Sequence, residues 1–315
     1  MRAFVINEFG ATGSVHDVPL PDPAAGQVRV TVHAAAVNVM DPIFIAGWMK
    51  DYMEHRFPFI PGIDLSGVVE RLGPGVTGFA VGDEVYGLVA KPFVGEGSFA
   101  ESVVAGADTL APKPASLTHL EAATVPHAGL TALAAIDVAD PQPGQVVVVV
   151  GATGGVGSFV TQLADVRGAT VVAVASESGA AQARDYGAAS TVDYAGGDVG
   201  GRLLAVYPDG VDILIDLHSD ADGLAELGRA VRAGGLAVSP RGPAAAAAER
   251  LEQHGVRLMI INRLPASRLP ELTALIDGGQ LRVPPIKVFR LEQTPVALAK
   301  MAAGHVRGKL VIAIA

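Results

Sequence analysis

The first third of the chain shows the alternation of apolar and polar residues that is typical of short, half-buried strands. Residues 28–32 read Val-Arg-Val-Thr-Val, a pattern with a period of two. Similar segments, each close to glycine or proline, recur at 68–72, 82–87 and 98–104. Strands this short, with turn residues this near, predict a small barrel or sandwich over residues 1–117.

Residues 118–260 have a different pattern, in which apolar strands alternate with helical stretches. Thr118 and Glu121 have the spacing of a capping box, which predicts the start of an alanine- and leucine-rich helix that continues to Asp137. Five consecutive valines at 146–150 predict a strand buried on both faces. Because strand and helix go on alternating, we expect a doubly wound parallel sheet. Further strands are expected at 170–175, 191–194, 211–216 and 236–239, and helices at 156–167, 180–186 and 224–231.

The remaining residues return to mixed character. We expect helices at 269–277 and 295–304, an extended segment at 283–289 and a strand at 310–314, while the alanine run 244–248 predicts one helical turn. A strand that follows a completed parallel sheet is expected to rejoin the first domain. The predicted fold is therefore α/β, with a discontinuous β-rich domain (1–117 and 261–315) and an inserted parallel-sheet domain (118–260).

Composition narrows the classes of function. The 315 residues carry 23 basic and 32 acidic side chains, a net charge of −9. An acidic chain without a lysine or arginine run is a poor candidate for binding nucleic acid or an anionic membrane. No apolar run reaches the about 18 residues that a membrane span needs, and Glu8 falls where a signal peptide would be apolar. We expect a cytoplasmic protein.

The absence of cysteine excludes disulfides, thiolate zinc ligands and a cysteine nucleophile.

The sharpest motif is a glycine-rich loop between the valine strand and a predicted helix, the context that a dinucleotide-binding fingerprint requires. We expect Gly154 to let the backbone approach a pyrophosphate and Gly157 to let the helix pack closely on the strand. The helix N-terminus would add free N–H groups and a positive dipole end. One departure is that Ala152 stands at the first glycine of G-x-G-x-x-G, and the alternative is a turn without a ligand. The expected binding residues are Ala152, Thr153, Gly154, Gly155, Val156 and Gly157.

The end of the second strand bears on which dinucleotide binds. NAD-specific sites place an acidic residue there for the ribose 2′-hydroxyl, whereas this strand ends at Ser176. A neutral hydroxyl removes the charge that would repel a 2′-phosphate. Ser178 follows in the same loop and Tyr194 ends the next strand, while Glu177 argues the other way. We expect NADP(H); the alternative is that both serines only form the loop.

Several segments, taken in order, resemble the zinc-free medium-chain dehydrogenase/reductase superfamily, in its quinone oxidoreductase (zeta-crystallin-like) branch. The resemblance covers essentially the whole chain, and the glycine loop has the Ala-x-Gly-x-x-Gly form of that branch. The segments that carry it are 36–41, 57–69, 78–87, 97–101, 126–132 and 304–311.

The resemblance implies a GroES-like β-rich catalytic domain, a Rossmann domain and an active cleft between them. It also implies the NADPH-dependent reduction of quinones or of the C=C bond of α,β-unsaturated carbonyls. A homodimer formed through the cofactor domain is usual in such relatives. The implied partner is a small apolar carbonyl or quinone.

Metal catalysis is not expected. The ligand positions of zinc-using relatives fall on Asn38, Ile63 and His127. Asn38 and Ile63 cannot replace a thiolate and an imidazole, and a catalytic zinc needs about three good protein ligands.

The resemblance places Asn38 near the nicotinamide ribose or the substrate carbonyl; the alternative is a turn-forming asparagine. Asp41 is either part of this site or a helix N-cap. His127 is expected near the nicotinamide, where it or water would supply the proton after hydride transfer; the alternative is a core histidine. Relatives often carry Tyr and Arg where this chain has Ile43 and Ile45, which predicts a more apolar pocket.

Three further residues are candidates for cofactor binding. Thr131 either meets the ribose or diphosphate, as in relatives, or caps its own helix. His218 follows a strand at its carboxyl end, where open α/β sheets bind ligands, and Arg241 holds a similar place. A different class of function, a protein of this fold that binds NADPH as a sensor or structural component without turnover, remains the alternative to an enzyme.

Overall fold

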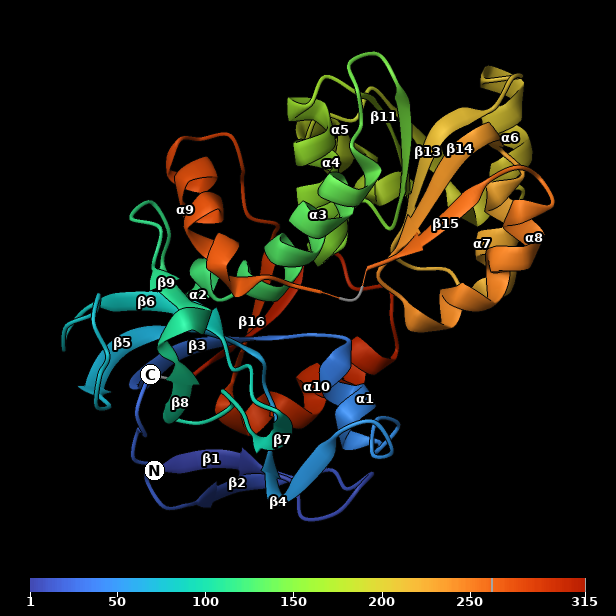
Figure 1. The fold of residues 1–315 in the computed structure, drawn as a ribbon. Helices are drawn as coiled ribbons and strands as arrows, with labels where there is room; N and C mark the ends of the chain where they lie inside the picture. The colour runs from blue at the N-terminus through green and yellow to red at the C-terminus, as the bar shows by residue number, and fades with distance from the viewer. Residues whose placement is uncertain (262, 315) are drawn as a thin grey trace. The chain divides into compact units, whose positions relative to one another are not determined.

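A computed structural model describes residues 1–261 and 263–314, and Figure 1 shows its secondary structure. The chain forms two compact units. Unit 1 comprises Met1–Leu130, Pro265–Gly279 and Pro285–Ala315, and unit 2 comprises Thr131–Leu264 and Gln280–Pro284. The domain boundaries expected after residues 117 and 260 stay a prediction.

Unit 1 is built on a seven-stranded sheet. Its order is β16-β17-β3-β5-β6-β9, with β8 also paired to β3. Neighbouring strands are antiparallel except β16 and β17. The other strands form two small sheets, β1-β2 and β4-β7. The strands are β1 (Arg2–Val5), β2 (Ser14–Asp17), β3 (Gln27–Val37), β4 (Glu54–Ile60), β5 (Asp64–Leu72), β6 (Glu84–Leu88), β7 (Phe93–Glu96), β8 (Ser102–Gly106), β9 (Leu110–Pro112), β16 (Ile286–Arg290) and β17 (Lys309–Ala313).

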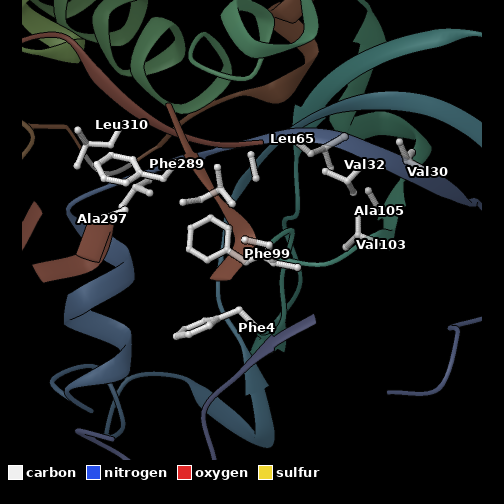
Figure 2. Close-up of a cluster of buried hydrophobic side chains, with 14 of the residues drawn as sticks. Phe4, Val30, Val32, Leu65, Phe99, Val103, Ala105, Phe289, Ala297 and Leu310 are labelled. Carbon is white, nitrogen blue, oxygen red and sulfur yellow. The ribbon is translucent and has the colours of Figure 1, made fainter. Parts of the chain in front are cut away.

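The core of unit 1 follows from the strand alternation. Val28, Val30 and Val32 of β3 are fully buried, as the period of two predicts. Figure 2 shows Val30 and Val32 in the same buried cluster as Leu65, Phe99 and Leu310, which come from distant parts of the chain. The helices of this unit are α1 (Met40–Ile45), α2 (His119–Ala122), α9 (Leu269–Asp277) and α10 (Thr294–Ala302), and α3 (Pro126–Ala139) has residues in both units.

Unit 2 is a doubly wound parallel sheet of six strands. The strand order is β12-β11-β10-β13-β14-β15. The chain adds β11 and β12 on one side of β10, then returns to the other side of β10 and adds β13, β14 and β15 there. This is the Rossmann order, in which ligands bind beyond the carboxyl ends of the strands where the direction reverses. Its strands are β10 (Val146–Val150), β11 (Thr170–Ala175), β12 (Ser190–Asp193), β13 (Val211–Asp216), β14 (Val231–Ser239) and β15 (Arg257–Ile260); its helices are α4 (Gly155–Val166), α5 (Ala180–Asp185), α6 (Val199–Val206), α7 (Ala221–Gly228) and α8 (Ala248–Glu252).

The structure confirms the predicted fold class and corrects some elements. The capping box at Thr118 is present, but the helix expected to run to Asp137 is divided into α2 and α3. The second helix begins at Pro126, because proline has no N–H to continue a helix and is favoured at a helix start. The helix expected to reach Val231 ends at Gly228, since Val231 pairs with Val211 in the sheet.

Two further predictions concern the later part of the chain. The alanine run lies largely in a 3-10 helix, Gly242–Ala247, and α8 begins only at Ala248. The strand expected to rejoin the first domain does so, because β17 pairs with β3. Among the helices of residues 1–261 and 263–314, none is long and apolar enough to cross a membrane.

Candidate functional site

The predicted cofactor residues, except Thr131, follow the carboxyl ends of the parallel strands of unit 2. Val150, the last residue of β10, pairs with Val174 of β11 and with Asp216 of β13. The glycine loop after β10, the serine loop after β11 and His218 after β13 therefore leave the sheet at the same edge. This edge lies at the reversal of strand order, where a dinucleotide is bound in such folds.

The glycine loop is a compact turn between β10 and α4. Gly151 has a φ of 78°, which favours glycine. A Cβ at Gly157 would lie 2.1 Å from the carbonyl oxygen of Gly151, so only glycine lets α4 approach the end of β10 this closely. The close packing predicted for Gly157 is confirmed. Since α4 begins at Gly155 with Gly154 as its N-cap, the first N–H groups of a 12-residue helix lie in this loop.

The loop after β11 packs against the glycine loop. Ser176 and Ser178 place their Oγ atoms 3.1 Å apart. A Cβ at Gly179 would lie 2.9 Å from Cγ2 of Thr153, so these two loops are in close contact. The structure thus brings the two serines to the glycine loop, and Ser178, like Glu177 before it, is exposed.

Three other predicted residues lie along the same edge. Tyr194 follows Asp193, which pairs with Ala175, and its side chain is 45% exposed. His218 is exposed, and its backbone N–H donates to Oδ1 of Asp216 at 2.9 Å. Arg241 lies beyond β14 and donates its backbone N–H to Oγ of Ser239 at 3.2 Å.

Arg241 and Thr131 differ from the other candidates in their surroundings. In the described part of the chain, the buried Nε of Arg241 has no hydrogen-bond partner, so this guanidinium keeps a donor for a ligand. Thr131 is 3% exposed and lies well inside α3, so the alternative that it caps its own helix is wrong. Its predicted contact with the cofactor stays a prediction.

The predicted catalytic residues lie in unit 1, around a buried ionic cluster. Asn38, Asp41, Asp64 and Lys309 are each 5% exposed or less. They come from the end of β3, from α1, from the start of β5 and from the start of β17. His127, at the start of α3, joins the cluster through its backbone. Burial of two carboxyl groups and one ammonium group in one cluster is unusual and requires mutual pairing.

Asp64 connects Asn38 to His127. Its Oδ1 accepts the backbone N–H of His127 at 2.8 Å, and its Oδ2 accepts Nδ2 of Asn38 at 3.0 Å. Lys309 Nζ completes the arrangement, 2.6 Å from Oδ1 of Asn38 and 3.5 Å from Oδ2 of Asp64. Side chains thus bind both the nitrogen and the oxygen of the Asn38 amide. The alternative of a turn-forming asparagine does not account for these two contacts.

The side chain of Asp41 binds backbone N–H groups and does not face a substrate. Its Oδ2 accepts the N–H of Asn38 at 2.7 Å and its Oδ1 accepts the N–H of Gly62 at 3.2 Å. Burial, and to a lesser extent the charge of Asp64, raise the pKa of Asp41 to about 7, although the hydrogen bonds and Lys309 act the other way. Asp41 is not a helix N-cap, because that position of α1 is Val39.

His127 keeps part of its surface exposed. Burial, with Lys309 adding to it, lowers the pKa of its imidazole, and Asp64 only partly opposes this. The neutral form is therefore favoured at pH 7. A neutral imidazole can take up a proton at one ring nitrogen, and the lowered pKa makes the imidazolium, once formed, a stronger proton donor.

Asp64 and Lys309 were missed by sequence reasoning. Each stands in a segment that supported the resemblance, but Asp64 and Lys309 are the first residues of apolar strands, a position typical of surface charges. Burial lowers the pKa of the Lys309 ammonium, while Asp64 and Asp41 raise it. A signal was available only in three dimensions, because β5 and β17 are far in sequence from β3 and α1.

A small hollow of unit 1 lies beside this cluster. It includes Gly62, whose N–H binds Asp41, and Ile63. Its lining combines aliphatic and aromatic side chains with Lys91 and Glu96, which form an ion pair. The apolar lining includes Phe44, Phe59, Val89, Phe93 and Val94. Over the described residues, no group of three or more His, Asp or Glu side chains is arranged to hold a metal ion.

Comparisons with known proteins agree with this architecture. A family model described as the alcohol dehydrogenase GroES-like domain matches residues 24–115, and a zinc-binding dehydrogenase model matches residues 186–312. The human protein named "NAD(P)H oxidoreductase RTN4IP1, mitochondrial" is 30% identical over 337 residues, which cover 91% of this chain and 81% of that protein.

Two other comparisons involve enzymes named for their substrates. The 2-methylene-furan-3-one reductase of Solanum lycopersicum is 29% identical over 99% of this chain and 79% of its own length. The solved structure of the quinone oxidoreductase from Coxiella burnetii matches with a TM-score of 0.90 and 31% identity, covering 100% of this chain and 99% of that one.

Proposed function

The chain belongs to the medium-chain dehydrogenase/reductase superfamily, in its quinone oxidoreductase branch, and from this premise we propose that it is an NADPH-dependent reductase of quinones or of the C=C bond of α,β-unsaturated carbonyls. Membership makes it an NAD(P)H-dependent oxidoreductase. The preference for NADPH and the class of acceptor are our proposals, and each is supported by particular residues.

The observation that carries the proposal is the compact glycine loop between β10 and the start of α4. A Cβ at Gly157 or Gly179 would meet the loop's own atoms at 2.1 or 2.9 Å, so glycine keeps the turn compact at the start of α4. Backbone N–H groups there would hold the phosphate oxygens. The residues proposed to bind the dinucleotide are Thr131, Ala152, Thr153, Gly154, Gly155, Val156, Gly157, Ser176, Ser178, Tyr194, His218 and Arg241.

The NADPH preference is supported by the serine loop. Ser176 and Ser178 offer hydroxyl groups beside the glycine loop, and neither carries a charge that repels a phosphate. Glu177 is exposed and can turn toward solvent. Arg241, whose Nε has no partner among the described residues, is a further proposed donor toward the anionic cofactor.

The class of acceptor and the residues that bind it are proposed from the side chains of unit 1. When bound, the reduced nicotinamide supplies a hydride. We propose that Asn38 donates a hydrogen bond to the acceptor's oxygen and that His127 relays a proton from water to the reduced product. Asp41 is proposed as a positioning residue, since both its oxygens hold backbone N–H groups. Ile63 and the phenylalanines of the adjacent hollow favour an apolar acceptor.

The test is a steady-state assay of NADPH and NADH oxidation with a panel of benzoquinones, naphthoquinones and 2-alkenals. We expect turnover with NADPH and at least one acceptor class, and a kcat/KM for NADPH about ten times that for NADH or more. NADPH binding by fluorescence titration, measured in the same samples, separates a failure of binding from a failure of chemistry. Tight binding without oxidation by any acceptor would instead support the sensor or structural role.

His127→Ala distinguishes these two functions further. A reductase that relays its proton through this imidazole should lose about tenfold or more in kcat, in line with general acid–base contributions of about 10²-fold or more. NADPH affinity should be unchanged. A sensor without turnover would show no response to this substitution in any assay with an acceptor.

We also propose a homodimer that forms through unit 2. Its outermost strand β15 has a free edge in the sheet order, and Met259 on this strand is 46% exposed. An exposed strand edge of this kind is a template for pairing with a second chain. Sedimentation equilibrium should give twice the chain mass, and Met259→Lys should shift the mass toward the monomer. A monomeric wild-type protein would refute this proposal.

A further inference from the structure

Lys309 is a buried lysine whose contacts all lead to the proposed catalytic residues. It opens β17, its side chain is 5% exposed, and its neighbours there are Asp64, Asp41 and His127. Its Nζ donates to Oδ1 of Asn38 at 2.6 Å and, more weakly, to the carbonyl of Val37 at 3.4 Å. A lysine is rarely buried without a specific partner, so the position has a role beyond packing.

The partners of Asn38 fix the orientation of its amide. An asparagine amide has an oxygen that only accepts and a nitrogen that only donates. The Lys309 ammonium has no acceptor, so it must face the oxygen, and the ionised Asp64 carboxylate has no donor, so it must face the nitrogen. The two partners together exclude the flipped amide, in which like groups would meet at 2.6 and 3.0 Å.

One N–H of the Asn38 amide remains weakly held. The nitrogen donates to Asp64 at 3.0 Å, and its contact with the carbonyl of Ala36 is long, at 3.4 Å. A ligand oxygen can compete for this second N–H at little cost. A flipped amide would instead present its oxygen to that ligand and repel a carbonyl.

We propose that Lys309 is a positioning residue for the reductase, which holds the Asn38 amide in the orientation that donates to the acceptor's oxygen. The role rests on the function proposed above. Asp64 extends the same arrangement, because its other oxygen holds the N–H of His127. Lys309 thereby sets the geometry of both proposed catalytic residues without touching the acceptor.

The kinetic test compares Lys309→Met and Lys309→Arg with Lys300→Met, a change of an exposed lysine on α10. We expect Lys309→Met to lower kcat at least tenfold and to leave the NADPH dissociation constant within twofold, because the cofactor residues lie in unit 2. Lys309→Arg keeps a donor that has no acceptor and should recover part of kcat. A kcat for Lys309→Met equal to that of Lys300→Met, or a folded Lys309→Arg no better than Lys309→Met, would overturn the proposal.

A second readout needs no turnover. The chain has only three asparagines, at positions 7, 38 and 262, so selective ¹⁵N-asparagine labelling gives three side-chain NH₂ pairs. The pair lost in Asn38→Asp identifies Asn38. We expect one of its protons to be shifted downfield and slow to exchange in the wild type, and this signature to be lost in Lys309→Met. An unchanged Asn38 pair would refute the positioning role.

The two readouts separate the inference from the proposed function. A wild type that reduces no acceptor would refute the reductase, while the amide spectra would still decide whether Lys309 orients Asn38. Should Lys309→Met fail to fold, Lys309→Gln serves in its place. Glutamine offers both a donor and an acceptor, so it no longer fixes the amide, and the same losses of kcat and of proton protection are expected.

Discussion

The carboxylate of Asp64 and the backbone N–H of His127 are joined by a 2.8 Å hydrogen bond, although 63 residues separate them. The bond places a negative charge at the second position of the 14-residue helix α3, where the helix dipole favours an anion. The same carboxylate accepts from Asn38 and faces Lys309. A single side chain therefore stabilises a helix start and neutralises a buried cation.

Replacing Asp64 by alanine should be strongly destabilising. It would leave the Lys309 ammonium buried with only the more distant Asp41 carboxyl to balance its charge, and removing one partner of a buried pair typically costs about 3–5 kcal/mol. Urea unfolding of Asp64→Ala should show this loss in the free energy of unfolding. Asp51→Ala, a change at an exposed aspartate of the same unit, should stay within about 0.5 kcal/mol of the wild type.

Gly157→Ala should disrupt the glycine loop that we propose binds the diphosphate. The new Cβ would meet the Gly151 carbonyl oxygen at 2.1 Å, and because that atom is backbone, the end of β10 and the start of α4 must separate. We expect NADPH affinity to fall tenfold or more by fluorescence titration. Gly242→Ala is the matched control, since nothing lies within 4 Å of a Cβ there. Equal affinities in the two variants would contradict the assignment of the diphosphate site.

Ser176→Asp should change cofactor preference. A carboxylate beside the 2′-phosphate would repel it, whereas the 2′-hydroxyl of NADH could donate to it. The dissociation constant of NADPH should rise at least tenfold more than that of NADH. Ser190→Asp introduces the same charge at the other end of the parallel sheet and should affect neither. If Ser176→Asp weakens both nucleotides equally, the ribose site lies elsewhere.

Asp41 should make the stability of the protein fall with rising pH. Its folded pKa is raised from 3.8 to about 7, so the native state binds more protons than the unfolded state between these values. The contribution is fully favourable below about pH 4 and is lost as the pH rises to about 7. Within this window the wild-type free energy of unfolding should decline more steeply than that of Asp41→Asn, by up to about 1.4 kcal/mol per pH unit. Parallel curves from pH 5 to 7 would show that Asp41 is already ionised there.

Much of the fold is predictable from the sequence because local patterns and tertiary structure agree. The valines of β10 are buried on both faces, and the alternation of strand and helix gives the observed parallel order. The errors occur where a tertiary contact or proline chemistry decides. Val231 has the pattern of a helix end but pairs with Val211, and Pro126 divides a run that otherwise favours one helix.

The candidate site was predictable to a smaller extent. The glycine loop is local, so its spacing and its flanking elements suffice to locate it. The cluster around Asn38 depends on Asp64 and Lys309, which come from elements 26 and 271 residues away along the chain. No periodicity indicates that a lysine at the start of a strand will be buried. Such long-range charge pairing is visible only once the topology of the sheet is known.

The pairing of β17 with β3 has a consequence for the order in which the units can form during synthesis. Residues 309–313 supply both an inner strand of the seven-stranded sheet and the buried ammonium group. While these residues are still in the ribosome, the Asp41 and Asp64 carboxyl groups lack the Lys309 counter-ion, and β3 lacks its partner strand β17. Residues 131–264, by contrast, emerge as one stretch that already holds all six parallel strands. The parallel sheet of unit 2 can thus form before β17 completes the sheet of unit 1.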